Sequence, residues 1–250
     1  MHRPTLPRWA QVLVVVAHPD DESFALGAVL DAFAQGGAGV CVLCLTRGEA
    51  STLHGVPGDL DVLRTAELND AAAALGVTRV WLRSYPDGAL ADVPLPALVR
   101  EVLDAASACG AEGLVAFDSS GVTGHDDHVR ATEAAISAAD ALDLPVLGWT
   151  LPAEVTDVLN AETGAAFHGH PPDEVDVVLP VDRTRQAVAV ACHASQAVPG
   201  SVLWRRLELL AGREHLRWLR KTADGPQTTA GAPAEVPLDV PTPPQLERTP

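Results

Sequence analysis

Short apolar runs alternate with longer helix-like segments over the first 150 residues, and this alternation constrains the fold more than any other feature. The short runs have the length and β-branched composition of strands, whereas the longer segments have the length and capping residues of helices. Alternation at this spacing predicts a mostly parallel sheet with helices on both faces. The expected strands are residues 12–16, 40–45, 79–82, 113–117 and 146–151, and the expected helices are residues 22–35, 61–75, 94–109 and 127–139.

The rest of the chain has a weaker pattern. One more strand is expected at residues 175–179, with helices at 182–192 and 201–221. Residues 222–250 are rich in proline and lack apolar periodicity, which predicts a disordered tail. The sequence therefore predicts one Rossmann-like α/β domain over residues 8–221, with its active site at the carboxyl ends of the strands.

Acidic residues outnumber basic ones by 33 to 17, which gives a formal net charge of −16. Such a chain repels nucleic acid and anionic membranes, so neither is expected as a partner. No segment approaches the roughly 20 consecutive apolar residues of a membrane helix, and no signal-type cleavage site follows the first apolar run, which favours a cytoplasmic protein. Cys41 and Cys44 would face opposite sides of a strand, which indicates buried thiols rather than metal ligands.

The first expected strand runs directly into His18, Pro19, Asp20, Asp21 and Glu22. Ligands bind at the carboxyl ends of strands in open α/β sheets, so these side chains are expected at the functional edge. Neighbouring carboxylates repel one another, and a bound cation removes that cost. The alternative is a structural helix start, in which an aspartate caps the helix and Glu22 complements its dipole.

A second polar cluster follows the strand expected at residues 113–117, and it ends in His125, Asp126, Asp127 and His128. Taken alone, this cluster is also consistent with a polar loop whose aspartates cap a helix. Two such clusters at one edge of a sheet are stronger evidence, because two histidines and one carboxylate form a divalent-metal site with positions open for water or substrate.

The two clusters resemble the motifs of the LmbE-like (PIG-L) family of zinc-dependent N-deacetylases, which includes N-acetylglucosaminyl deacetylases of mycothiol-type biosynthesis. The resemblance covers residues 10–200. Asp126 departs from it, because many members have proline there. Weaker markers agree in order and spacing, namely residues 46–49, Arg64 and Glu67, residues 74–77, Asp87 with Gly88, and residues 193–196.

The resemblance implies a role for each residue of the two clusters. His18, Asp21 and His128 would bind zinc, and Asp20 would be the general base. His125 would stabilise the oxyanion or help to protonate the leaving amine. The implied reaction is hydrolysis by zinc-activated water, which removes an acetyl group from the amide nitrogen of an N-acetylated sugar or sugar conjugate; Fe²⁺ is an alternative metal in the cell.

The resemblance further implies that Arg47, Glu49 and Asp87 line the sugar pocket, although Arg47 and Glu49 also fit a surface ion pair. Family members are often oligomeric, so a homo-oligomer is a further expectation. Other residues are expected in structural roles: Arg64 and Glu67 as a pair on one helix face, His193 in the interior, and residues 168–170 in a solvated loop.

Two competing functions stay open at this point. A non-haem iron enzyme also uses two histidines and one carboxylate, but its usual double-stranded β-helix disagrees with the strand–helix alternation. The other alternative is a catalytically silent family member that binds zinc or a glycan. The intact cluster residues count against such a loss of activity.

Overall fold

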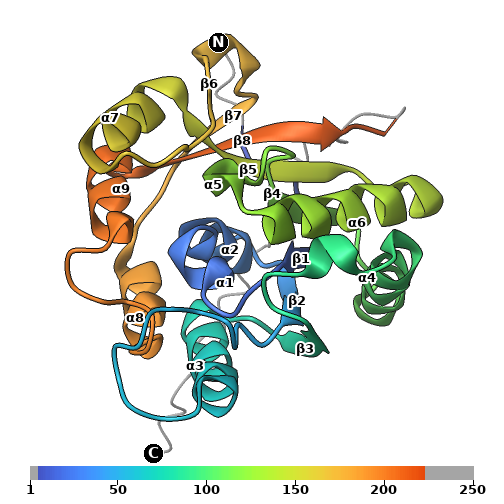
Figure 1. Ribbon diagram of the computed structural model, residues 1–250. Helices are drawn as coiled ribbons and strands as arrows, with labels where there is room; N and C mark the ends of the chain where they lie inside the picture. Colours follow the sequence, from blue (N-terminus) through green and yellow to red (C-terminus); the bar gives the residue numbers. More distant parts are fainter. Residues whose placement is uncertain (1–4, 223–250) are drawn as a thin grey trace, which may run out of the picture.

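The computed structural model describes residues 5–222, which form an eight-stranded sheet with helices on both faces (Figure 1). The strand order is β3-β2-β1-β4-β5-β8-β7, and the short β6 pairs with β5. The pairs among β1 to β5 are parallel, whereas β8 is antiparallel to both β5 and β7. This topology confirms the predicted Rossmann-like α/β fold.

Most elements lie where the apolar pattern places them. The strands are β1 (Gln11–Val16), β2 (Gly39–Thr46), β3 (Arg79–Tyr85), β4 (Gly113–Phe117), β5 (Val146–Pro152), β6 (Gly169–His170), β7 (Val177–Pro180) and β8 (Arg213–Arg220). The helices are α1 (Asp21–Phe24), α2 (Gly27–Gln35), α3 (Leu60–Leu75), α4 (Leu95–Cys109), α5 (Gly121–Gly124), α6 (Asp126–Leu142), α7 (Ala153–Thr163), α8 (Thr184–Cys192) and α9 (Val202–Leu210). Short 3₁₀ turns lie at Leu90–Asp92 and Pro172–Glu174.

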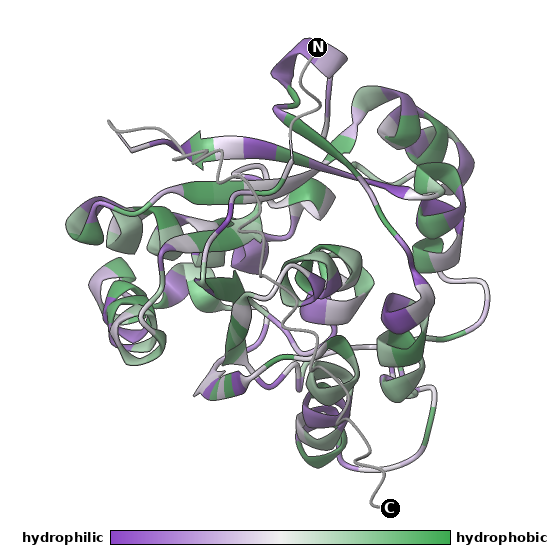
Figure 2. Ribbon diagram, turned by 180° about the vertical axis from the view of Figure 1, so that it is seen from behind, coloured by the Kyte–Doolittle hydropathy of each residue, from purple (hydrophilic) through white to green (hydrophobic). Residues whose placement is uncertain are grey.

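Two apolar layers enclose the sheet. Val14 of β1 faces the layer that includes α2 and α3, and Val15 faces the layer that includes α4 and α6. Because β1 is buried on both faces, its sequence is a continuous apolar run rather than an alternating one, and the interior strands are mostly coloured hydrophobic in Figure 2. Cys41 and Cys44 belong to opposite layers, as predicted.

The helix expected at residues 22–35 is interrupted between α1 and α2. The carbonyl oxygens of Ser23 and Phe24 accept hydrogen bonds from side chains instead of from the next helical turn. Gln186 Nε2 donates to Ser23 O at 2.9 Å, and Arg206 Nη2 donates to Phe24 O at 2.7 Å. The interruption thus follows from contacts with α8 and α9, which lie far away in the sequence.

The single helix expected at residues 201–221 is wrong. It consists of α9, a break at Ala211 and Gly212, and the strand β8. Ala211 has a positive φ of 49°, which is incompatible with a right-handed helix and ends α9. Burial alternates only at the start of β8, where Arg213 is exposed and both Glu214 and Leu216 are fully buried. The sequence obscures this period of two, because the buried Glu214 is charged and the apolar Trp218 and Leu219 are adjacent.

Two further differences concern the later part of the chain. The helix α7 was not predicted, because Val155 and Leu159 give it only a short apolar stripe. The tail predicted for residues 222–250 lies outside the described residues, apart from Thr222. Within residues 5–222, no helix combines the length and the apolar character that crossing a membrane requires.

Candidate metal centre and substrate pocket

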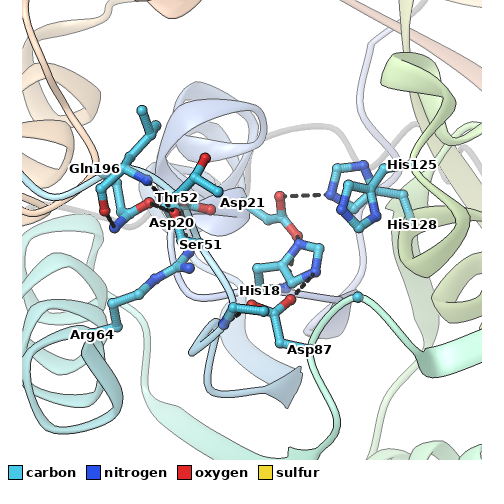
Figure 3. Close-up of a pocket in the computed structure, with 13 residues that line it drawn as sticks. His18, Asp20, Asp21, Ser51, Thr52, Arg64, Asp87, His125, His128 and Gln196 are labelled. Carbon is cyan, nitrogen blue, oxygen red and sulfur yellow. Dashed lines mark hydrogen bonds and ion pairs between the residues drawn. The ribbon is translucent and has the colours of Figure 1, made fainter. Parts of the chain in front are cut away.

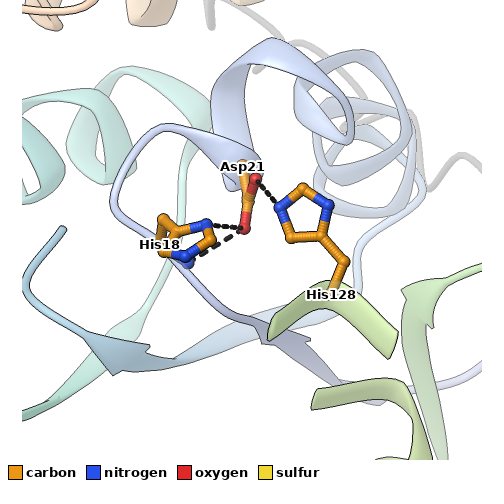
Figure 4. Close-up of side chains that lie close together, drawn as sticks. All are labelled: His18, Asp21 and His128. Atoms are coloured by element: carbon orange, nitrogen blue, oxygen red, sulfur yellow. Dashed lines mark hydrogen bonds and ion pairs between the residues drawn. The ribbon is translucent and has the colours of Figure 1, made fainter. Parts of the chain in front are cut away.

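Two loops meet at the carboxyl edge of the sheet, because the strands that precede them, β1 and β4, are neighbours. The loop after β1 carries His18, Asp20 and Asp21, and the loop after β4 leads to His125 and His128. Ligand atoms of His18, Asp21 and His128 all lie within 4.8 Å of one another, and all three residues are buried (Figure 4). Two imidazoles and one carboxylate suit a divalent metal.

Asp21 lies at the first residue of α1, where its carboxylate is held from several directions. Its Oδ2 accepts a hydrogen bond from His18 N at 2.9 Å, and its Oδ1 lies 3.2 Å from His128 Nε2. Burial opposes ionisation, but His128, His18 and the backbone donor outweigh it and hold the pKa of Asp21 well below its usual value. Asp21 is therefore a fixed carboxylate between the two histidines.

His128 presents Nε2 to Asp21 because its other ring nitrogen is occupied. Nδ1 lies 3.2 Å from the carbonyl oxygen of Gly121 and 3.2 Å from Thr123 Oγ1. A proton on Nδ1, donated to that carbonyl, leaves the lone pair of Nε2 free for a metal. Between Gly121 and Thr123, the buried Val122 has a positive φ of 58°, which is rare for a β-branched residue.

His18 is surrounded by carboxylates. Its Nε2 lies 3.0 Å from Asp87 Oδ1 and 3.1 Å from Asp127 Oδ2, and its Nδ1 lies 3.7 Å from Asp21 Oδ2. Burial alone lowers the pKa of His18, but the hydrogen bonds to Asp127 and Asp87 outweigh it and raise the pKa to about 10. The carboxylates thus favour a positive charge here, either a proton on the ring or a metal ion that replaces it; with Nε2–H bonded to carboxylates, Nδ1 is the nitrogen that would bind the metal.

Asp127 was not among the predicted site residues. Its carboxylate accepts hydrogen bonds from Gly88 N at 2.8 Å and Leu90 N at 2.9 Å, besides its contact with His18. It therefore ties the start of α6 to the loop after β3. With His18 and His125 it forms a second set of potential ligands that overlaps the first.

Asp20 is held beside the metal-ligand set by an arginine from α3. Arg64 Nη2 donates to Asp20 Oδ2 at 2.9 Å and also to Pro19 O, and Arg64 Nη1 donates to Gly48 O at 2.6 Å. Burial raises the pKa of Asp20 to about 6, although Arg64 opposes this shift. The backbone of Asp20 has a φ of 122°, so its position is enforced by these contacts.

The expectation that Arg64 and Glu67 pair with each other is wrong. Arg64 faces the pocket, whereas Glu67 accepts hydrogen bonds from the backbone N–H and hydroxyl of Ser195 at 2.8 and 2.6 Å. Their spacing places them on one side of α3, but each finds a partner from another part of the fold. Spacing alone does not show this, because both partners are remote in sequence.

His125 caps the N-terminus of α6. Its Nδ1 accepts a hydrogen bond from Asp127 N at 3.2 Å, and its ring centroid lies 4.8 Å from that of His18. Burial and the nearby histidines lower the pKa of His125, so the neutral ring is favoured. A neutral ring that accepts at Nδ1 carries its proton on Nε2, which makes Nε2 a donor.

A cavity of about 400 Å³ opens above these residues (Figure 3). In the view of Figure 3, His125 and His128 lie on one side, and Ser51, Thr52 and Gln196 lie on the other. The cavity has the volume of a small-molecule site. Its lining consists of His18, Asp20, Asp21, Ala50, Ser51, Thr52, Leu53, Arg64, Asp87, Gly88, His125, His128 and Gln196.

The three residues expected in the sugar pocket have different positions. Asp87 lines the cavity and accepts a hydrogen bond from Ala50 N at 2.8 Å. Glu49 accepts one from Asp87 N at 3.1 Å, and Arg47 donates to Asp61 at 2.7 Å; neither belongs to the lining. Substrate contact by all three stays a prediction.

Two histidines outside the clusters are also placed by the structure. His193 is fully buried, with Nε2 2.7 Å from Glu22 Oε1, which agrees with a structural role. His170 does not lie in a solvated loop. Its side chain is mostly buried, 3.2 Å from Asp118 and 2.9 Å from Glu174.

The buried donor set and the cavity above it define a candidate metallohydrolase on an α/β scaffold. The chain belongs to the PIG-L, or LmbE-like, family: the family model described as GlcNAc-PI de-N-acetylase matches residues 13–139, just over half of the chain. This match confirms the resemblance drawn from the motifs. It also confirms the predicted class of enzyme, a hydrolase that removes an N-acetyl group by cleaving an amide bond.

Individual relatives agree with this assignment. The 1D-myo-inositol 2-acetamido-2-deoxy-alpha-D-glucopyranoside deacetylase of Kineococcus radiotolerans is 29% identical over 88% of this chain and 80% of its own length. Among solved structures, the A40926 pseudoaglycone deacetylase matches with a TM-score of 0.66 at 20% identity, over 84% of this chain and 96% of that chain.

The same fold also occurs in an enzyme with another activity. GalB, the 4-carboxy-2-hydroxymuconate hydratase from Pseudomonas putida KT2440, matches with a TM-score of 0.60 at 19% identity, over 84% of this chain and 96% of that chain. At such identities the structural matches show a shared fold alone. The details of the activity must therefore be argued from the site.

Proposed function

We propose that the protein deacetylates an N-acetylglucosamine-type sugar conjugate with a zinc ion held by His18, Asp21 and His128. The observation that carries this proposal is the convergence of these three residues beside a cavity that Asp20 also lines. Two imidazole nitrogens and one carboxylate leave coordination positions open, as in catalytic rather than structural zinc sites. Zinc, when bound, supplies Lewis acidity toward the oxygen atoms of water and of the acetamide.

Asp20 is the residue that we assign to proton abstraction. Its carboxylate lines the cavity next to Asp21, and Arg64 fixes its orientation. As a water molecule attacks the acetyl carbon, Asp20 accepts a proton from it. The carbon–nitrogen bond then breaks, and acetate and the amine are released. The two adjacent aspartates thus have different roles: Asp21 would bind the metal, and Asp20 would accept the proton.

His125 is the residue that we assign to the opposite side of the acetamide. Its Nδ1 is occupied by a backbone N–H, so its Nε2–H is available to the cavity. From there it donates a hydrogen bond to the developing oxyanion, while the proton that the leaving amine needs is the one that Asp20 took from the water. The same ring that caps α6 would thus also act on the substrate.

The lining of the cavity supports a polyhydroxylated substrate. Asp87 offers a carboxylate acceptor to the cavity, and Ser51 and Thr52 offer hydroxyl groups. The name of the Kineococcus relative supports an inositol as the group attached to the acetylated sugar. We also keep as predictions a cytoplasmic location and assembly with a second copy of the chain.

Release of primary amine from a panel of N-acetylglucosamine conjugates, an inositol glycoside among them, tests this function. We expect the zinc-loaded wild type to release amine and Asp20→Asn to lose about 10²–10⁴-fold in kcat, the usual contribution of a positioned base. The zinc content of the variant should equal that of the wild type.

Two results would contradict the proposal. Normal turnover by Asp20→Asn would remove Asp20 from proton transfer, whereas no release from any conjugate by zinc-loaded wild type would remove the deacetylase substrate class. Chelation followed by reloading with zinc or Fe²⁺ identifies the metal that supports turnover.

A further inference from the structure

The wall of the pocket opposite the histidines is a loop without regular structure. Residues 50–53 line the cavity between β2 and α3, and none of them belongs to a helix or strand. Within this segment, Leu53 N donates to Ser51 Oγ at 3.2 Å. At its start, Ala50 N is held by Asp87 at 2.8 Å. Such a loop needs support from elsewhere in the fold if it is to keep one shape.

That support comes from a buried glutamine after α8. Gln196 is 2% exposed, and its amide bridges the loop. Its Oε1 accepts a hydrogen bond from Ser51 Oγ at 2.7 Å, and its Nε2 lies 3.2 Å from Leu53 O and 3.0 Å from Ser195 Oγ. One side chain therefore satisfies a hydroxyl and a carbonyl of the wall and also lines the cavity itself.

A backbone contact extends the same connection. Gly55 N donates to Ser195 O at 2.8 Å. A Cβ atom at Gly55 would lie 2.2 Å from the carbonyl oxygen of Ala194, so only glycine permits this approach. The loop is therefore joined to residues 194–196 by both a side chain and its own backbone.

The turn that carries Gln196 is itself fixed to α3. Glu67 accepts hydrogen bonds from both the N–H and the hydroxyl of Ser195. One helical turn earlier, Arg64 of the same helix holds Asp20. The wall of the pocket and the carboxylate assigned to proton transfer thus share one support, although Gln196 itself does not contact Asp20.

We propose that Gln196 is a positioning residue that holds residues 50–53 as the substrate-contacting wall and so determines how tightly sugar conjugates bind. This inference rests on the proposed function for its substrate class. Because Gln196 acts on the wall rather than on the metal ligands, its loss weakens substrate binding and leaves the chemical step and metal content largely intact.

The test uses the zinc-loaded full chain and three variants. Gln196→Ala removes the hydrogen bonds, Gln196→Met keeps most of the volume without them, and Gln35→Ala makes the same truncation on the exposed side of α2. We expect both Gln196 variants to raise KM for the best conjugate about 10-fold, to change kcat less than 2-fold, and to speed hydrogen exchange of the amides of Leu53 and Gly55. Gln35→Ala should match the wild type in all three measurements.

Several outcomes overturn the proposal. If Gln196→Met behaves like the wild type, the residue only fills space. If exchange speeds up while KM is unchanged, the wall does not contact the substrate. If kcat falls and KM does not, Gln196 acts on the chemical step.

The Ser51 hydroxyl provides an independent check in case truncation of Gln196 disturbs folding. Ser51→Ala removes one partner of the amide, and the double variant Ser51→Ala/Gln196→Ala should raise KM less than the product of the two single effects. If the wild type deacetylated no conjugate, the proposed function would fall. The exchange rates of the loop amides would then still decide whether Gln196 holds the wall.

Discussion

At the scale of single residues, Asp127, which follows β4, orients His18, which follows β1. It thereby connects the two polar clusters of the sequence. Its carboxylate is fixed by two backbone donors and lies 3.1 Å from His18 Nε2. Carboxylates in this position fix the tautomer of a metal-binding histidine and increase its basicity. The two clusters are therefore joined by a hydrogen bond as well as by the proposed metal.

Asp127→Asn is expected to weaken zinc binding by about 10–100-fold, because an amide is a poorer acceptor for the His18 proton. Competition with a chromogenic chelator measures this affinity without any substrate. Asp126→Asn is the matched control, since Asp126 is the exposed neighbour and makes no side-chain contact with His18. Equal zinc affinity in the two variants would show that Asp127 does not support the metal site.

Sequence patterns predict residues of this kind only in part. His18, Asp21 and His128 are visible because each follows a buried strand within a compact polar motif. Asp127 belongs to the same motif, but its role depends on the direction of its side chain toward the loop after β3. Arg64 and Gln196 appear only among the weaker markers of the resemblance, and their roles were not predicted because their partners come from loops that are distant in sequence.

At the scale of elements, α3 supports the pocket through Arg64, which holds Asp20. The arginine packs closely against the loop after β2. Gly48 has a φ of 67°, and a Cβ atom there would lie 2.1 Å from Arg64 Nη1. The guanidinium group therefore lies directly against the backbone at Gly48. A glycine is required here both for the conformation and for the space.

Gly48→Ala should displace Arg64 and, with it, Asp20, so we expect kcat/KM to fall at least about 10-fold, as misplaced catalytic groups typically cause. Gly110→Ala is the control, because Gly110 also has a positive φ, of 66°, but no atom lies within 4 Å of its added Cβ. The control should lose about 1 kcal/mol of unfolding free energy and keep its activity. Steady-state kinetics and urea unfolding separate the two effects, and full activity of Gly48→Ala would show that Arg64 need not hold Asp20.

The sequence predicts an element well where its apolar residues form one clear pattern, and poorly where that pattern is irregular. The inner strands β1, β2, β4 and β5 are mostly apolar and almost wholly buried, so composition alone predicts them, whereas the edge strand β3 is only partly buried and carries two arginines. The stretch from Ser201 to Lys221 changes from helix to strand at Ala211 and Gly212, and the sequence predicts one helix because no clear period of two marks the strand. The break between α1 and α2 depends on Gln186 and Arg206, which no local pattern includes.

At the scale of the whole molecule, β8 closes the sheet by pairing with β5 on one side and β7 on the other. It also carries the buried Glu214, which accepts hydrogen bonds from Trp149 Nε1 at 2.7 Å and from Arg183 Nη1 at 2.5 Å. The final described strand is thus an internal part of the sheet and of its polar interior.

A chain that ends at residue 222 should therefore fold and turn over substrate like the full chain, with an unfolding free energy within about 0.5 kcal/mol of it. A chain that ends at residue 211 lacks β8 and leaves edges of β5 and β7 unpaired, so it should fail to reach the native state. Circular dichroism and thermal unfolding measure both. A marked loss of stability in the chain that ends at residue 222 would show that residues 223–250 contribute to the stability of the domain.

The position of β8 also sets an order of events during synthesis. His18, Asp21 and His128 have all been translated once the ribosome has passed residue 128, whereas Gln196 and β8 follow later. At 5–20 residues per second, the interval between residue 128 and residue 220 lasts on the order of 10 s. Until β8 is made, β5 and β7 lack the strand that joins them, and until Gln196 is made the proposed substrate-contacting loop has no anchor. A nascent chain on the ribosome therefore contains every ligand proposed for the metal before the wall of its substrate pocket can be held in place.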